Sequence, residues 1–215
     1  HGQKQTLFLS QAWDLDVDAV TFGKSIAGGV FPLSGVALRA GASVLHAGGR
    51  TVMQSHTYSG SNVRSLMTAV EVLRKIPSLY EHMASNATVL ERAMRAFASQ
   101  SKSLFRVQGL GLMWGALLNP QHPFLLNGTS SSSSSVGAAA KVMQIFKAQC
   151  GAHNVLPYYV PAGGFMVTPL FDAPEAVMLD IEARLQAALE GTLRQLQLHA
   201  DGSAVAATAE AAGAI

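Results

Sequence analysis

The pattern of apolar and polar positions changes its period along the chain, and it predicts short strands first and long helices later. An apolar run at residues 19–22 stops at Gly23 and predicts a buried strand, and residues 36–39 are a second strand candidate. A glycine-rich loop, residues 25–35, separates the two strands. A further polar loop, residues 54–62, precedes the first long helical segment.

Two helices are predicted after this loop, with a bend between them. Apolar residues recur at helical spacing before Pro77 and again beyond it, where the amphipathic pattern continues for about twenty residues. The positions that carry the pattern are Leu66, Ala69, Val70, Leu73 and Ile76 before the proline, and Leu79, Met83, Leu90, Met94 and Phe97 after it.

The period changes again near residue 101 and predicts a mixed arrangement of strands and helices. The predicted strands are residues 104–107, 112–118 and 165–168, and the predicted helices are residues 136–150 and Pro174 to about 198. The serine-rich segment 127–135 and residues 151–164 are predicted loops. The alanine-rich end, residues 199–215, is predicted to be a disordered tail.

Composition narrows the classes of protein that fit this pattern. The 215 residues are 49% hydrophobic and only 13% charged, which is enough to bury a core and excludes disorder as the main state. We expect the surplus apolar surface to form a subunit interface and not to enter a membrane, because no long uninterrupted apolar run is present.

The charge and the residue types also exclude several kinds of binding site. A net charge of +2 gives no excess of basic residues for binding nucleic acid. A single cysteine, Cys150, excludes an internal disulfide, and the histidine spacing predicts no metal site.

Lys24 is the candidate for chemistry, because it follows a strand and opens the glycine-rich loop. Three interpretations are open: a solvated lysine at a strand end, the end of a phosphate-binding P-loop, and a lysine that forms a Schiff base. The P-loop requires a glycine where Asp18 stands, and we reject it. A rigidly held, partly desolvated lysine is nucleophilic toward an aldehyde, so the Schiff-base interpretation is chemically possible.

The sequence resembles a known family in four ordered segments that extend over roughly residues 5 to 195. The run DAVTFGKSIAGGVFPLSG resembles the lysine segment of the class III, fold-type I, pyridoxal-phosphate aminotransferases, and SHTYSGSN resembles their threonine loop. VQGLGLMWGALL is similar to the strand pair that opens the C-terminal domain of the family, and FMVTPLFDAPEAV is similar to its closing strand and last helix.

The resemblance implies an α/β fold that corresponds to the C-terminal half of a class III enzyme. Residues 1–100 would be the C-terminal part of the large cofactor-binding domain, with a mixed, mainly parallel sheet, and its linker helices. Residues 101–198 would be the α+β small domain. The parts of the family's site that pair with the cofactor ring and cup its phosphate lie upstream of His1, so the resemblance implies an incomplete chain.

The resemblance also implies a function and two site residues. Lys24 would bind pyridoxal 5'-phosphate as a Schiff base and move the proton during amino transfer between a small-molecule amino donor and a carbonyl acceptor. Thr57 would bind the cofactor phosphate of the neighbouring subunit in a homodimer. The pattern leans toward the semialdehyde-aminomutase and omega-aminotransferase branches, because no arginine stands near Phe165 and Met166 to bind a substrate carboxylate.

One alternative from another class stays open. The chain could be a catalytically inactive fragment or pseudoenzyme that acts only as a folding or interaction partner. No charged segment followed by an apolar one begins the sequence, so we expect a cytoplasmic or organellar location and no secretion.

Overall fold

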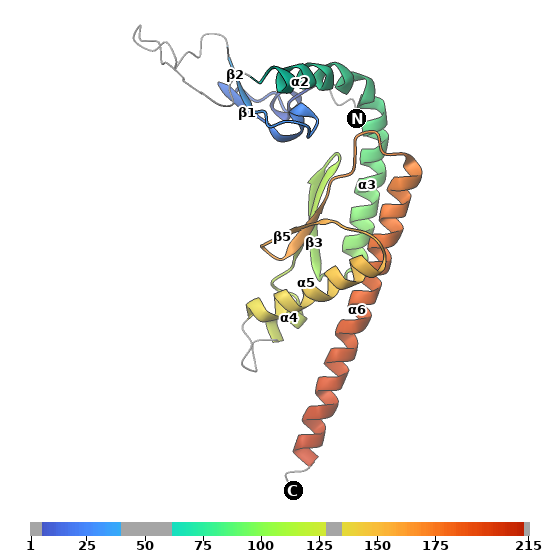
Figure 1. Ribbon diagram of the computed structural model, residues 1–215. Coiled ribbons are helices and arrows are strands. Elements are labelled where there is room, and N and C mark those ends of the chain that lie inside the picture. The colour runs from blue at the N-terminus through green and yellow to red at the C-terminus, as the bar shows by residue number, and fades with distance from the viewer. Residues whose placement is uncertain (1–5, 40–61, 128–134, 213–215) are drawn as a thin grey trace, which may run out of the picture. The chain divides into compact units, whose positions relative to one another are not determined.

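The computed structural model describes residues 6–39, 62–127 and 135–212, and it divides into two compact units. The first unit is His1–Tyr80 and the second is Glu81–Ile215 (Figure 1). The predicted boundary between domains at residue 100 remains a prediction.

The first unit contains short elements around one hairpin and one longer helix. They are α1 (Leu9–Ala12), β1 (Ala19–Phe22), the 3₁₀ turn η1 (Lys24–Ala27), β2 (Gly35–Leu38), α2 (Val63–Lys75) and the 3₁₀ turn η3 (Ile76–Leu79). Both predicted strands and the first predicted helix are therefore present, and the predicted bend at Pro77 is the turn η3.

β1 and β2 pair antiparallel from Ala19 opposite Leu38 to Phe22 opposite Gly35. We expected a mainly parallel sheet for the whole large domain, but these two strands are joined directly by residues 23–34. A parallel pair would need a crossover connection, usually through a helix, so a direct return of the chain gives an antiparallel hairpin. A Cβ atom on Gly35 would lie 2.5 Å from Cζ of Phe22, so the ring of Phe22 occupies the space over this glycine.

The first unit has almost no core of its own. Among its described residues, only Ala27, Ser65 and Ala69 are buried, and all three have small side chains. Large apolar side chains of the same unit are exposed, for example Met67 at 66% and Trp13 at 58%. Since burial of apolar surface is the main stabilising term in folding, the packing within this unit contributes little to its stability.

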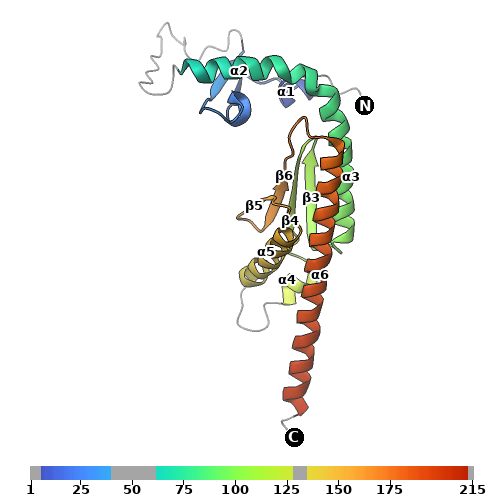
Figure 2. The same ribbon diagram turned by 45° about the vertical axis from the view of Figure 1, so that its right-hand side comes forward.

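The second unit contains helices and a four-stranded sheet. Its elements are α3 (Tyr80–Gln100), β3 (Phe105–Leu110), β4 (Met113–Leu118), α4 (Pro123–Asn127), α5 (Ser135–Ala152), β5 (Tyr158–Val160), β6 (Gly164–Val167) and α6 (Glu175–Ala212). The strands are ordered β3-β4-β6-β5, and every neighbouring pair is antiparallel. Figures 1 and 2 show α3 and α6 side by side along this sheet.

Four phenylalanine rings form the centre of the core of the second unit. Phe97 lies on α3, Phe146 on α5, Phe105 on β3 and Phe165 on β6, and each is at most 2% exposed. Their ring centroids lie between 4.8 and 6.0 Å apart, in edge-to-face, tilted and stacked pairs. Such aromatic pairs contribute stability beyond the apolar area that they bury, so this cluster ties the two helices α3 and α5 to the strands β3 and β6 of the sheet.

Some elements differ from the sequence prediction. Residues 158–160 form an edge strand. We expected a loop here, because the segment between Pro157 and Pro161 is only three residues long. α6 continues to Ala212 where we expected a disordered tail, and the high intrinsic helix propensity of alanine favours this continuation. The short helix α4 carries no periodic pattern that could have predicted it.

Candidate active site

Lys24 begins η1 directly after the end of β1, as the sequence analysis expects of the candidate lysine. Its φ is +54°, which is a left-handed conformation that few residues other than glycine adopt. The side chain is exposed, and its ammonium has no partner among the described residues. The structure therefore presents an accessible primary amine from a constrained backbone position, and the described residues do not provide the partial desolvation that the Schiff-base interpretation considered.

The loop after Lys24 turns tightly and contacts α2. Gly28 ends η1 at φ +61° and donates its backbone N–H to the carbonyl of Ser25 at 2.9 Å. A Cβ atom on Gly28 would lie 3.5 Å from Cγ2 of Val72, so the loop backbone rests against the side chains of α2. The positive φ and this close approach to α2 give Gly28 a turn and packing role.

Asn62 and Ser65 fix the start of α2 beside the same loop. The Asn62 side chain accepts hydrogen bonds from the backbone N–H groups of Arg64 (3.1 Å) and Ser65 (3.3 Å), so it caps the helix. The Ser65 hydroxyl donates to the carbonyl of Pro32 at 3.3 Å. This link between the helix and the loop has no signal in the sequence, because serine is common and Pro32 is 33 residues away.

Thr57, the second predicted site residue, lies outside the described residues. The same holds for its neighbour His56. The role of Thr57 in phosphate binding therefore stays a prediction.

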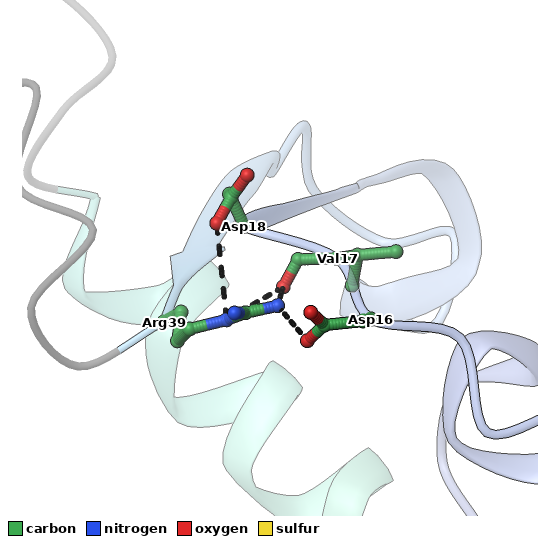
Figure 3. Close-up of polar contacts among 4 residues, drawn as sticks. All are labelled: Asp16, Val17, Asp18 and Arg39. Atoms are coloured by element: carbon green, nitrogen blue, oxygen red, sulfur yellow. Dashed lines mark hydrogen bonds and ion pairs between the residues drawn. The ribbon is translucent and has the colours of Figure 1, made fainter.

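Arg39 is engaged within the first unit. Figure 3 shows its guanidinium between the carboxylates of Asp16 and Asp18, with the carbonyl of Val17 beside it. Its Nη2 and Nε donate to the carbonyl of Val17 at 2.9 and 3.2 Å, and its Nε lies 3.8 Å from Oδ1 of Asp18. These contacts hold the chain before β1 to the end of β2.

Cys150 and the neighbouring Tyr159 in the second unit both have pKa values that burial shifts upward. Cys150 is fully buried, and burial raises the pKa of its thiol to about 11, against a smaller opposite effect of the neighbouring Tyr159 hydroxyl. Burial also raises the pKa of Tyr159, whose buried hydroxyl has no hydrogen bond of good geometry within the described part of the chain. Cys150 is therefore a small buried residue of the core.

The His122 side chain accepts a hydrogen bond from the backbone at the start of α4. The backbone N–H of Phe124 donates to Nδ1 of His122 at 3.3 Å, which requires this nitrogen to be unprotonated. Burial lowers the pKa of His122, and a hydrogen bond with the backbone of Lys102 has a smaller, opposite effect.

Two classes of site have no support in the described residues. Within residues 6–39, 62–127 and 135–212, no three His, Cys, Asp or Glu side chains come together in a way that could bind a metal ion. In the same part of the chain, no helix is long and apolar enough to cross a membrane.

Solved structures show the same fold. An (S)-enantioselective omega-transaminase from Thermomicrobium roseum superimposes with a TM-score of 0.69 at 22% sequence identity, over 89% of this chain and 41% of that chain. A PLP-bound aminotransferase mutant from Vibrio fluvialis superimposes with a TM-score of 0.71 at 18% identity, over 91% of this chain and 42% of that one. The predicted α/β fold, part of the fold-type I transaminase fold, is confirmed.

Sequence comparison gives the family. An acetylornithine aminotransferase of Xanthomonas campestris pv. campestris is 26% identical over 199 residues, which are 90% of this chain and 43% of the relative. The chain thus spans less than half the length of the relatives that it matches. The family model described as "Aminotransferase class-III", a family of PLP-dependent enzymes, matches residues 2–151. The chain therefore belongs to the class III aminotransferases.

Proposed function

We propose that this chain forms the lysine-bearing part of a PLP-dependent aminotransferase. The observation that carries the proposal is Lys24, an exposed amine without a described partner, held at a left-handed backbone position at the end of β1. Strained backbone positions cluster at functional sites, because the surrounding structure must hold them. The described residues fit attachment of the cofactor at this point, since Lys24 offers an accessible primary amine beside the small residues Gly28 and Gly29.

Lys24 has two tasks in this proposal. Its Nζ holds the cofactor covalently at rest, and once released it accepts and returns a proton during amino transfer. When bound, pyridoxal phosphate supplies the electron sink that stabilises a carbanion beside the amino group. The substrates are a small-molecule amino donor and a carbonyl acceptor, and the sequence favours the aminomutase and omega-aminotransferase branches.

Covalent labelling tests the role of Lys24. The chain is incubated with pyridoxal phosphate, treated with borohydride and digested, and the cofactor mass is located among its peptides. We expect a yellow protein that borohydride bleaches, with the label on Lys24, and we expect no specific label in Lys24→Ala. Lys102→Ala is the matched control, because Lys102 is also exposed and has a φ of +50°. Equal labelling of Lys24 and Lys102 would show that the cofactor does not bind selectively at Lys24.

We propose that Thr57 contributes to the cofactor site of a second copy of the chain in a homodimer. Support comes from the run SHTYSGSN and from the start of α2 at Val63 directly after it. Mixing Lys24→Ala with Thr57→Val tests this arrangement. If Thr57 acts across the interface, the mixed dimer contains one intact site and regains labelling, whereas each variant alone labels weakly. No regain in a verified mixed dimer would place both residues in one subunit.

A second candidate function follows from the coverage of the relatives. The chain matches 43% of the curated relative, and its first unit buries only three described side chains. These facts favour a chain that is inactive alone and serves as a folding or interaction partner. Absence of cofactor uptake by the chain, even at high cofactor concentration, would support this second candidate and count against the first.

A further inference from the structure

The loop that carries Lys24 is anchored at three places. At its base, Phe22 pairs with Gly35 in the β1–β2 ladder. In its middle, Gly28 rests against Val72 of α2. At its far end, the carbonyl of Pro32 accepts the hydroxyl hydrogen of Ser65 at 3.3 Å. The third anchor is a side-chain hydrogen bond, and it joins the loop to the first turn of the helix.

Ser65 is placed to act on the loop and not on its own helix. Its side chain is fully buried (0% exposed), and a buried hydroxyl without a partner is costly, so its bond to Pro32 is favoured. Thr68, one turn later, provides the contrast. Its hydroxyl donates to the carbonyl of Arg64 at 2.8 Å and therefore remains within α2. The two hydroxyls are similar in chemistry but differ in what they connect.

We propose that Ser65 is a positioning residue that holds the Lys24 loop on α2. A left-handed lysine persists only where the surrounding contacts over-determine its backbone. The contacts next to Lys24 are backbone hydrogen bonds between residues three apart in the sequence. The N–H of Ile26 donates to the Gly23 carbonyl at 3.3 Å, and the N–H of Val30 donates to the Ala27 carbonyl at 3.1 Å. These bonds lie within the loop and cannot fix it to the rest of the unit. The hydrogen bond from Ser65 supplies this attachment together with the packing of Gly28 on Val72, and its importance for catalysis rests on the proposed role of Lys24.

Hydrogen–deuterium exchange tests the attachment without any cofactor. The reporters are the bonded amides of Ile26, Gly28 and Val30, in peptides that cover residues 24–33. We expect Ser65→Ala to speed exchange of these amides by about two- to tenfold, the range that the loss of one hydrogen bond gives. Exchange in β3, α5 and α6 should not change.

Two further variants make the exchange result specific. Thr68→Val removes a hydroxyl but keeps the methyl group near Gly28, so it should leave exchange in residues 24–33 unchanged. Ser65→Cys keeps the volume and a weak donor, and it should give an intermediate rate; it also replaces Ser65→Ala if that variant fails to fold. Wild-type exchange rates in Ser65→Ala, or equal acceleration by Thr68→Val, would overturn the proposal.

The cofactor provides an independent readout that separates positioning from general stability. In Ser65→Ala, we expect the pyridoxal phosphate concentration for half-maximal labelling of Lys24 to rise by about two- to tenfold. Faster loop exchange with unchanged labelling would overturn the positioning role. If the wild-type chain takes up no cofactor, the proposed function fails for this chain, and the exchange experiment alone decides whether Ser65 anchors the loop.

Discussion

Substitution of Gly109 by alanine should destabilise the second unit, because the space for a Cβ atom is already occupied. Gly109 pairs with Trp114 across β3 and β4. A Cβ atom at Gly109 would lie 2.5 Å from Cδ2 of Trp114 and 2.5 Å from the carbonyl oxygen of Met113. Both distances are shorter than non-bonded atoms tolerate, so either the indole ring or the hairpin backbone must move.

The expected magnitude follows from the contacts that this movement disturbs. Trp114 is 4% exposed, its Nε1 donates to the carbonyl of Gly111 at 3.1 Å, and the guanidinium of Arg95 lies 5.7 Å from its ring centroid. Overpacking of a core costs about 1–3 kcal/mol, and loss of the indole hydrogen bond adds about 1 kcal/mol. Removal of a glycine from the unfolded chain offsets about 0.4–1 kcal/mol. We therefore expect a net loss of about 2 kcal/mol in the free energy of unfolding for Gly109→Ala.

Gly115→Ala is the matched control in the same hairpin. The nearest atoms to a Cβ at Gly115 are two carbonyl oxygens at 3.9 Å, so this alanine fits and should be neutral or slightly stabilising. Urea denaturation followed by far-ultraviolet circular dichroism measures both variants, with tryptophan fluorescence in a Trp13→Phe background to isolate Trp114. An unchanged urea midpoint for Gly109→Ala, or one equal to that of Gly115→Ala, would refute the packing argument.

The remaining predictions concern the core, a helix cap and a titratable group. Phe97→Ala should lower the free energy of unfolding by about 3–5 kcal/mol in urea denaturation, because Phe97 contacts three other rings; a loss near 1 kcal/mol would contradict this. Asn62→Ala should cost about 1 kcal/mol locally, measured as faster hydrogen exchange in the first turn of α2, with Asn62→Asp retaining protection. The pKa of His122 is lower in the folded than in the unfolded state, so its contribution to stability is present above pH 6.5 and is lost as pH falls through the folded pKa. Urea midpoints between pH 8 and 5 should show this loss, and His122→Asn should remove this component of the pH dependence.

Much of the fold could be predicted from the spacing of apolar residues along the chain. β1, β4, α2 and α3 were predicted in this way, and the type of each element is confirmed. β4 and α3 bury apolar residues of the pattern in the core, whereas most of those of β1 and α2 are exposed or half-buried. Segments without a long pattern could not be predicted in the same way. β5 is three residues long, and its pairing with β6 depends on a partner strand and not on its own sequence.

The candidate site was predictable in identity but not in geometry. The glycine-rich segment after a strand, together with the family resemblance, identified Lys24. The left-handed φ of Lys24 belongs to a loop whose Gly28 rests against Val72 of α2, and these two segments are about 40 residues apart in the sequence. The bond between Ser65 and Pro32 is equally non-local. A sequence pattern describes neighbours along the chain, so it could not show either constraint.

Because Cys150 is buried, the reactivity of its thiol reports when the core of the second unit opens. The sequence contains one cysteine, its side chain is 0% exposed, and its pKa is about 11. Only an exposed thiolate reacts with a disulfide reagent, so the folded second unit is protected both by exclusion of the reagent and by lack of thiolate. The rate at which a disulfide reagent labels Cys150 at neutral pH therefore measures how often this core opens, and no probe has to be introduced. A labelling rate that is unaffected by cofactor would show that cofactor binding leaves this core's opening unchanged.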